Sequence, residues 1–478
     1  RLRCSTSARS GQRHWIAWRT LEQARLVYLR TERHPCVPDL PAGPEYRSFD
    51  ALYEQHDEFP AVYATIVAAL LNEAAQGDLV YAVPGDPLVG ETTTRLLLDQ
   101  APAHGVQIEI VHGISFIEPM LRQAGVDALD GLQIFDAMAL GVMHHPPINP
   151  EYPALIAQVY SRQTASDLKL TLMNQYPDDF KVLLVHAAGT SEQHSERLPL
   201  YAIDRSDATA HLTSLYLPPL GPYTSFEAFQ EIVAHLRAPE GCPWDRKQTH
   251  LSLRSYLIEE AYEVLEALNE EDGQALAGEL GDLLLQIVLH TQIAIEEGEF
   301  TMADVMRLIN EKMIRRHPHV WGSVDVQGSA DQVLTNWEAI KRAEHAENGR
   351  ERKSRLDGVP MAAPSLVVAL KIQDKAAKVG FDWPDVGGVI AKAEEEMREI
   401  LNAPDDASRA QEIGDLIFVL VNWLRWLGVD DPESIVHRIN RKFVKRFRYV
   451  EENAARPLEE MTLAEMDALW DAAKAQGL

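Results

Sequence analysis

The spacing of hydrophobic and polar residues changes near the middle of the chain. In the first half, short apolar runs alternate with helix-like stretches, and the clearest runs are LVYAV (79–83), VQIEIV (106–111) and KVLLVHA (181–187). Such runs, bounded by turn residues, are typical of buried strands, so this half is predicted to be α/β. From Ser225 onward, apolar residues recur at helical spacing, which predicts an all-helical second half.

Two stretches interrupt these patterns and predict domain boundaries. LPPLGP (217–222) is rich in proline and glycine, and the charged segment 341–355, which precedes Pro360 and Pro364, is predicted to be a linker. A chain of 478 residues also exceeds what one hydrophobic core usually serves. We therefore predict a multidomain protein, with an α/β domain at 1–222 and all-α modules at 223–352 and 353–478.

Three blocks of the helical half recur in the same order. They pair Glu260 and Glu263 with Glu396 and Glu399, Glu279 and Asp282 with Glu412 and Asp415, and Lys312 and Arg316 with Lys442 and Arg446. The separations are 136, 133 and 130 residues, respectively. One ExxE match would be unremarkable, but an ordered triple with apolar neighbours indicates two related modules.

The repeated acids predict a metal site in each module. Residues three apart share a helix face, so an ExxE helix facing an ExxD helix presents four carboxylates. Carboxylate oxygens suit Mg²⁺, and Mn²⁺ accepts the same donors. A lone ExxE more often lines a solvated face, but the runs LLLQIV and IFVLV that follow the acids predict little solvent exposure.

The repeated basic pairs leave two interpretations open. Lys312 with Arg316, and Lys442 with Arg446, either contact substrate phosphates or neutralise nearby acids. Trp337 and Trp470 lie downstream in corresponding segments and are candidates for stacking on a base, although a buried tryptophan is more often part of a core.

The composition of the chain limits the classes of partner that it can bind. A net charge of -27 argues against nucleic-acid binding, which depends on clustered Lys and Arg, and makes a metal the expected intermediary for an anionic substrate. No apolar run approaches the roughly 20 residues needed to cross a bilayer, so no membrane partner is expected. Cys4, Cys36 and Cys242 lack metal-ligand or disulfide-framework spacing, and no secretory signal is visible, so a cytoplasmic location is predicted.

The motifs of the helical half resemble the MazG family of nucleoside triphosphate pyrophosphohydrolases. The resemblance rests on CPWDRKQTHLSLRSYLIEEAYEVLEAL, ELGDLLLQIVLH and RRHPHVWG, and it continues through KIQDKAAKVGFDW into a second module. It implies dimerising helical modules that hold Mg²⁺ and hydrolyse NTPs to NMP and pyrophosphate. The implied metal ligands and catalytic acids are Glu260, Glu263, Glu279 and Asp282, with Glu259 beside them, and Glu396, Glu399, Glu412 and Asp415, with Glu395 beside them.

The same resemblance implies nucleotide contacts in the second module. These are Lys392, Lys442, Arg446 and Trp470. Both acid sets are complete, so neither module is excluded. If only one is active, the tandem pattern favours the second.

The first half resembles the tetrapyrrole methylase-like domain that is fused to MazG in YabN-type proteins. YLRTERHP, YAVPGDPLVGE and LTLMNQYPDDFKVLLVHAAGT carry this resemblance, which implies an S-adenosylmethionine pocket near Pro84, Gly85 and Asp86. The opening RLRCSTSARSGQRHWIAWRT lacks the glycine-rich loop of such methylases, and their first strand also seems to be missing from it. Methyl transfer is therefore not expected of the chain as written.

Together these observations favour a Mg²⁺-dependent pyrophosphohydrolase that acts on NTPs or dNTPs. The resemblance further implies a homodimer that removes aberrant nucleotides. Two alternatives stay open at this point. One is an S-adenosylmethionine-dependent methyltransferase in which the helical modules are accessory, and the other is a non-catalytic helical scaffold with acidic faces.

Overall fold

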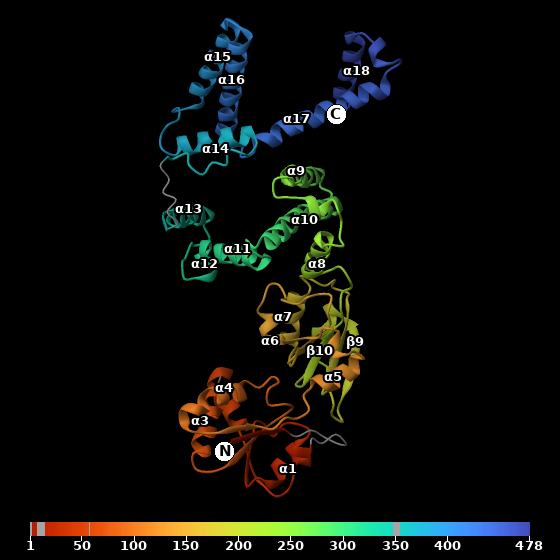
Figure 1. The fold of residues 1–478 in the computed structure, drawn as a ribbon, viewed down its shortest axis with the longest axis vertical. Coiled ribbons are helices and arrows are strands. Elements are labelled where there is room, and N and C mark those ends of the chain that lie inside the picture. The colour runs from red at the N-terminus through yellow and green to blue at the C-terminus, as the bar shows by residue number, and fades with distance from the viewer. Residues whose placement is uncertain (1, 7–14, 57, 348–353) are drawn as a thin grey trace. The chain divides into compact units, whose positions relative to one another are not determined.

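The computed structural model describes residues 2–6, 15–56, 58–347 and 354–478 (Figure 1). The chain divides into two compact units, Arg1–Met302 and Ala303–Leu478. This division differs from the predicted ranges 1–222, 223–352 and 353–478, which stay predictions. Within the described residues, no helix has the length and apolar character that a bilayer crossing requires.

The first sheet of the α/β domain is entirely parallel. Its strands are β1 (Leu2–Thr6), β2 (Leu26–Leu29), β3 (Glu45–Ser48), β4 (Leu79–Val83) and β5 (Ile108–Ile110), in the spatial order β3-β2-β4-β1-β5. The helices of this part are α1 (Trp15–Gln23), α2 (Asp50–Gln55), α3 (Phe59–Ala74), α4 (Thr92–Gln100) and α5 (Ile117–Ala124). Tyr81 and Leu97 are fully buried in the core that this sheet shares with α3 and α4. The predicted strands at 79–83 and 106–111 are thus confirmed.

The expectation of a missing first strand is wrong. Residues Leu2–Thr6 form β1, which pairs in parallel with β4 on one side and with β5 on the other, as in the register Cys4 opposite Tyr81. The segment was misjudged because its residues lack a continuous apolar run, whereas β-pairing to two neighbours depends on backbone groups. The position of the absent glycine-rich loop falls in residues 7–14, outside the described part of the chain.

A second, mixed sheet completes the α/β domain. Its strands are β6 (Gln133–Asp136), β7 (Ala154–Ala157), β8 (Lys181–His186), β9 (His194–Pro199) and β10 (Thr213–Leu217), in the order β6-β7-β10-β8-β9. Only β6 and β7 pair in parallel among them. The helices are α6 (Ala137–Gly141) and α7 (Arg162–Leu172). Buried Leu184, Leu215 and Ile156 lie side by side across β8, β10 and β7 and form the core against α7.

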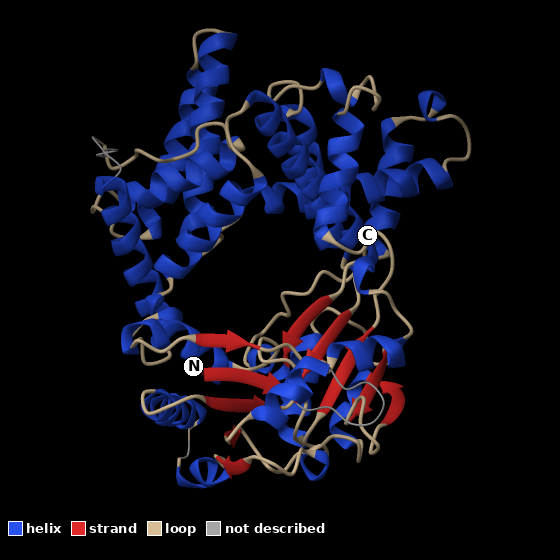
Figure 2. Ribbon diagram, turned by 60° about the horizontal axis from the view of Figure 1, so that its bottom comes forward, coloured by secondary structure: helices blue, strands red, loops and turns tan. Residues whose placement is uncertain are grey.

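The remainder of the described chain is helical, as predicted (Figure 2). The first unit contains α8 (Phe226–Arg237), α9 (Arg254–Glu270) and α10 (Gly273–Glu297). The second holds most of α11 (Met302–Arg316), then α12 (Pro318–Trp321), α13 (Ala330–Glu347), α14 (Ser365–Ala377), α15 (Val386–Asn402), α16 (Asp406–Trp426), α17 (Pro432–Asn453) and α18 (Leu463–Ala475). Short 3-10 helices are η1 (Val37–Asp39), η2 (Ala101–His104), η3 (Ala128–Asp130), η4 (Leu200–Arg205), η5 (Asp245–Lys247) and η6 (Leu458–Glu460).

Part of the predicted linker is helical. Residues 341–347 belong to α13, because alanine, glutamate, lysine and arginine are strong helix formers even where few apolar side chains are present. Residues 348–353 lie outside the described part of the chain.

Two helical hairpins carry the repeated acids. α9 packs against α10, and α15 packs against α16. Each second helix begins at an aspartate cap: the Asp272 side chain accepts from the amides of Gln274 and Ala275, and the Asp405 side chain accepts from that of Ser408. These caps satisfy free amides of the first turn and fix where the acidic helix starts.

Candidate functional site

The first hairpin brings together acids from both of its helices. Carboxylate oxygens of Glu260 on α9 and of Glu279 and Asp282 on α10 lie within 4.8 Å of one another. Glu263 lies one turn beyond Glu260 and stands outside this group of three, as does Glu259. Burial, followed by the nearby charges of Asp282 and Glu263, raises the pKa of Glu260. Converging acids that repel one another in this way are suited to a cation.

Gln286 is a contact of this site that the sequence patterns did not single out. Its Nε2 donates to Oε1 of Glu260 at 3.4 Å, while its own Oε1 is buried with no hydrogen-bond partner among the described residues. The available signal was that Gln286 is the one polar side chain in the run LLLQIV, one turn after Asp282.

The second hairpin repeats the arrangement with one added cation. Carboxylate oxygens of Glu396, Glu399 and Glu412 lie within 4.8 Å of one another. Lys392 Nζ lies 2.8 Å from Oε1 of Glu396 and donates to Glu395 at 3.0 Å. These bonds, first to Glu396 and then to Glu395, raise the pKa of Lys392. Asp415 lies outside the group of three.

The surroundings of Glu396 show whether the second acid group suits a cation. The residue is 4% exposed, and its Oε2 is buried with no hydrogen-bond partner among the described residues. A buried, unsatisfied carboxylate oxygen is costly unless it binds a partner. With Glu399 and Glu412 beside it, the donor set is all oxygen and anionic, which suits Mg²⁺ or Mn²⁺.

The low solvent exposure predicted for the acids holds only for Glu396. Glu263, Glu399, Asp282 and Asp415 are exposed, and Glu260, Glu279 and Glu412 are partly buried. The reason is that the neighbouring apolar side chains of these helices are themselves on the surface of the chain, as with Leu280, Ile413 and Ile417, each more than 40% exposed. In these helices an apolar run therefore marks an apolar face but does not mark its burial.

The arginines of the repeated basic pairs lie beside tryptophans rather than beside the repeated acids. Arg316 lies over the Trp337 ring at 5.8 Å, and Arg446 lies over the Trp470 ring at 5.6 Å. Their second contacts differ. Arg316 binds both carboxylate oxygens of Glu344, with the shortest distance 2.6 Å, whereas Arg446 donates to the main-chain oxygen of Leu478 at 2.7 Å.

Among the described residues, the lysines of these pairs show no such contact. Lys312 is partly buried on α11, and Lys442 is exposed on α17. Arg316 therefore gives an example of the neutralising interpretation. Contact with substrate phosphates stays a prediction for the other three residues.

The loop that follows β4 holds the residues expected for S-adenosylmethionine. Gly85 adopts φ +85°, a left-handed conformation that favours glycine. Asp86 Oδ1 accepts from the amide of Leu88, and Oδ2 accepts from the amide of Gly113 and pairs with Nδ1 of His112. Asp86 thus orders its own loop through Oδ1 and joins it to the loop after β5 through Oδ2, at the carboxyl end of a parallel sheet, where ligands usually bind.

Comparisons with known proteins agree with this organisation. A model of tetrapyrrole (corrin/porphyrin) methylases matches residues 16–204, and a model of the MazG nucleotide pyrophosphohydrolase domain matches residues 248–321. The chain is 43% identical to the Bacillus subtilis protein YabN, over 95% of this chain and 94% of that protein. The chain belongs to the MazG family, in the form fused to a methylase-like domain.

Shorter MazG relatives match about half of the chain. A Thermotoga maritima protein named nucleoside triphosphate pyrophosphohydrolase/pyrophosphatase MazG is 46% identical over 52% of this chain and 95% of its own length. An Escherichia coli nucleoside triphosphate pyrophosphohydrolase is 42% identical over 51% of this chain and 95% of its own length. The MazG domain model spans the first acid group, while the second lies outside the range 248–321.

Proposed function

We propose that this MazG-family chain is a Mg²⁺-dependent hydrolase that converts NTPs or dNTPs and water to the monophosphate and pyrophosphate. The observation that carries the proposal is the second acid group, where the unsatisfied Oε2 of buried Glu396 lies in a group with Glu399 and Glu412. The names of the Thermotoga maritima and Escherichia coli relatives support the reaction class.

The residues of each hairpin have distinct roles in this proposal. Glu260, Glu279 and Asp282, or Glu396, Glu399 and Glu412, would hold the ion, with Glu263 and Asp415 as further acids within the repeated motifs. Bound Mg²⁺ neutralises phosphate charge and lowers the pKa of a coordinated water.

Lys392 would exchange partners when the site is filled. Its ammonium group now offsets the charge of Glu395 and Glu396. Once a divalent cation takes over that task, the ammonium group can turn to a substrate phosphate, as a mobile point charge does. Lys442, Arg446 and Trp470 are the other proposed nucleotide contacts of this module, and Lys312 and Arg316 those of the first.

We favour the second module as the working one. Among the described residues, Arg446 bonds to a main-chain oxygen and pairs with no acidic side chain, whereas Arg316 is bound by Glu344. A guanidinium group that is not already neutralised binds phosphate more strongly.

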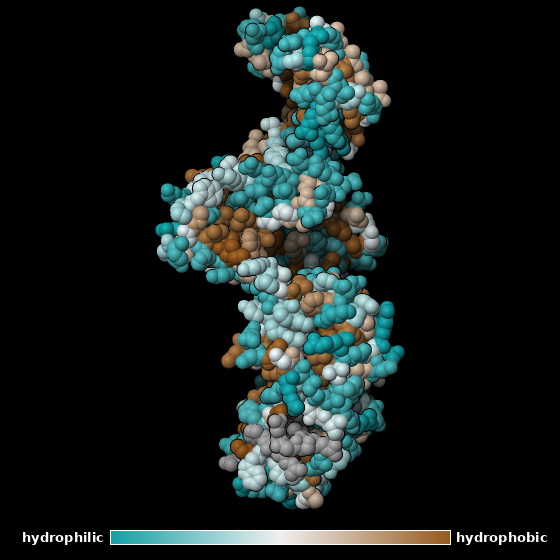
Figure 3. Space-filling view, turned by 90° about the vertical axis from the view of Figure 1, so that its right-hand side faces the viewer, coloured by the Kyte–Doolittle hydropathy of each residue, from teal (hydrophilic) through white to brown (hydrophobic). Residues whose placement is uncertain are grey.

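We also propose that the chain acts as a homodimer. Large apolar side chains reach the surface over the helical region (Figure 3). They include Ile258, Leu265 and Leu280 near the first acid group and Ile413 and Ile417 near the second. Exposed apolar faces of this extent usually mark protein interfaces. A mass from light scattering of one chain at micromolar concentration would contradict this proposal.

Product analysis tests the reaction itself. The intact protein would be incubated with each common NTP and dNTP, with Mg²⁺ or with a chelator, and the products would be separated by ion-exchange chromatography. The monophosphate and pyrophosphate in equal amounts, only with Mg²⁺, are expected. Release of inorganic phosphate with the diphosphate, or no turnover of any substrate, would contradict the proposal.

S-adenosylmethionine binding by the α/β domain is a second candidate function. It is favoured by the presence of β1 between β4 and β5 in the parallel sheet and by the Gly85–Asp86 loop at the carboxyl end of β4. In it, Gly85 would allow close approach of the ligand, and Asp86 would fix the loop. Calorimetric titration of the intact protein with S-adenosylmethionine tests it, and an absence of binding heat removes this candidate without affecting the hydrolase.

A further inference from the structure

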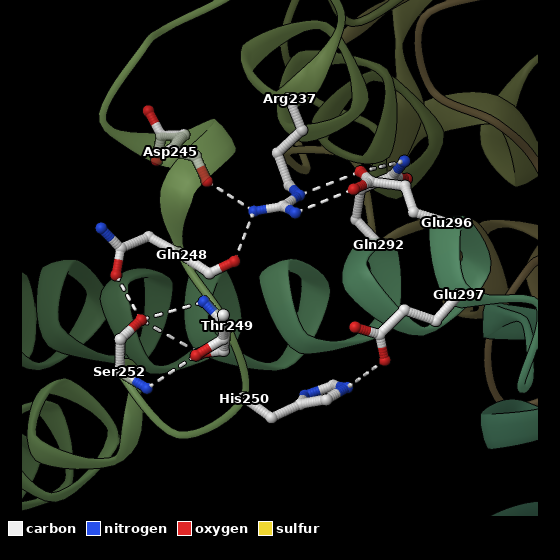
Figure 4. Close-up of polar contacts among 9 residues, drawn as sticks. All are labelled: Arg237, Asp245, Gln248, Thr249, His250, Ser252, Gln292, Glu296 and Glu297. Carbon is white, nitrogen blue, oxygen red and sulfur yellow. Dashed lines mark hydrogen bonds and ion pairs between the residues drawn. The ribbon is translucent and has the colours of Figure 1, made fainter.

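A cluster of histidine and glutamate side chains lies apart from the two acid groups in sequence and in chemistry. It joins the turn before α9 to the C-terminal end of α10 (Figure 4). One nitrogen of His250 and one carboxylate oxygen each of Glu297 and Glu299 lie within 4.8 Å of one another. Unlike the acid groups, this cluster offers an imidazole donor.

The fold holds both sides of the cluster in place. Arg237 binds Glu296 through two bonds of 2.8 and 2.9 Å and also donates to the main-chain oxygens of Asp245 and Gln248, which ties the turn to α10. The turn around His250 is closed by two reciprocal hydrogen bonds. The amide of Thr249 donates to the Ser252 hydroxyl at 2.9 Å, and the amide of Ser252 donates to the Thr249 hydroxyl at 3.2 Å. His250 is therefore presented by a fixed turn.

The end of α10 directs both carboxylates toward this turn. Gly298 ends the helix with φ +73°, and the amide of Glu299 bonds back to the oxygen of Ala294. This C-cap reverses the chain after Glu297, so Glu299 returns to the same end of the helix. Glu296 is neutralised by Arg237, whereas no Lys or Arg among the described residues lies within ion-pair distance of Glu297 or Glu299.

His290 completes the arrangement. It lies two turns before Glu297 on α10, and its ring is nearly parallel to that of His250, with centroids 5.0 Å apart and planes 5° apart. The two Nδ1 atoms are 2.7 Å apart, so one must donate and the other accept. If His250 Nδ1 donates, its Nε2 keeps a free lone pair, and this Nε2 is the atom that lies 4.0 Å from Oε2 of Glu297.

We propose that His250, Glu297 and Glu299 form a binding site for a divalent transition-metal ion of the zinc class, with His290 as a positioning residue. One imidazole and two carboxylates are a ligand set that zinc accepts, with a remaining position for water. An imidazole donor favours such ions over Mg²⁺. The hydrogen bond from Nδ1 to His290 fixes the ring in the way that outer partners of metal-binding histidines do. Bound metal would fasten the turn before α9 to α10.

Zinc retention by the intact protein in excess Mg²⁺ tests the site, because Mg²⁺ competes for the oxygen-only acid groups. Chelator-treated protein would be dialysed against Zn²⁺ with millimolar Mg²⁺, and bound zinc would be counted by mass spectrometry. Wild type is expected to keep one Zn²⁺ per chain, and His250→Gln and Glu297→Gln are expected to lose it. His235→Gln, an exposed histidine of α8, is the matched control and should keep it.

Two further variants separate positioning from folding. His290→Phe should weaken zinc binding by about 10- to 100-fold. His290→Gln, whose side-chain oxygen can accept the same bond, should restore part of it, with the unfolding temperature of the metal-free protein unchanged. If His250→Gln does not fold, exposed Glu297→Gln alone decides. Equal zinc retention by wild type and the folded variants, or no retained zinc in wild type, would overturn the proposal.

Discussion

The two acid groups come from the same repeated motifs and differ in what neutralises them. In the first hairpin, Glu260 has the neutral amide of Gln286 beside it and a raised pKa. In the second, Lys392 bridges Glu395 and Glu396, and the repeat places Tyr256 at the corresponding position of the first. The repeated sequence therefore conserves the donors while placing them in two electrostatic settings.

The arginines over the tryptophans also differ between the modules, but here the neutralised one is in the first module. In the first module the arginine over the tryptophan pairs with Glu344, whereas in the second it pairs with no acidic side chain among the described residues. The second module thus has a partly neutralised acid group and an arginine without an acidic side-chain partner. The first has the neutral Gln286 beside its acids and a neutralised arginine. This contrast is what leads us to favour the second module for catalysis.

Replacing one acid in each group should have the largest effect. Glu396→Gln keeps the shape of the side chain and removes its charge, so Mg²⁺-dependent pyrophosphate release should fall by at least about 100-fold, comparable with losing one oriented charge-stabilising group. Glu260→Gln is the matched variant of the first module and should leave most turnover. The opposite outcome would assign catalysis to the first module.

Removal of the tryptophan in each module should have a smaller effect. Trp470→Ala should raise KM by about 10-fold with little change in kcat, since stacking on a base is worth roughly 1–3 kcal/mol. Trp337→Ala should leave KM within twofold. Steady-state kinetics with one NTP and one dNTP would measure both, and a fall in kcat alone would show that Trp470 supports the fold rather than the base.

Exchange at the lysine position tests the electrostatic contrast directly. Lys392→Met removes a cation that competes with the metal, so the Mg²⁺ concentration for half-maximal binding should fall, on the order of 10-fold. Tyr256→Lys should weaken binding at the first site. Lys442→Met, on an exposed face of α17, is the control. Calorimetry that finds weaker Mg²⁺ binding in Lys392→Met would mean that the lysine helps to arrange the acids.

The smallest effect concerns Glu344. Hydrogen bonds from Arg316 and then Arg315 lower its pKa to about 2. The pKa of Glu344 is thus lower in the folded protein than in the unfolded chain. The ionised carboxylate therefore stabilises the fold fully above about pH 4.5, and this contribution is lost as the pH falls toward 2. Glu344→Gln should cost about 1 kcal/mol at pH 7 and less at pH 3. Urea unfolding at both pH values measures this, and an equal cost at both would contradict it.

Apolar periodicity and local repeats were sufficient to predict most of the fold. The runs at 79–83 and 181–187 became β4 and β8, and the helical half appeared where strand signals ended. The first strand was missed because its pairing to β4 and β5 is long-range and leaves little trace in five residues of sequence. The helical part of the linker was missed because helix propensity acts without apolar spacing.

The acid groups were predictable for a different reason. Glu260 with Glu279, and Glu396 with Glu412, come from facing helices. The recurrence of the ExxE and ExxD motifs in the same order pointed to these pairs. Their solvent exposure was not predictable, because neighbouring apolar side chains such as Leu280 and Ile413 are exposed as well. The contact of Gln286 with Glu260 was beyond spacing rules, because it joins two different helices. The pairs of Lys392 with Glu395 and Glu396 follow helical spacing and could have been predicted.

Pyrophosphate release by the double variant Glu260→Gln/Glu396→Gln tests the central claim most directly. The assay would compare it with wild type on a panel of NTPs and dNTPs, with and without Mg²⁺, after circular dichroism has confirmed the same helix content. We predict Mg²⁺-dependent release by wild type and none above background by the double variant. Equal release by both proteins would show that these carboxylates do not carry the reaction.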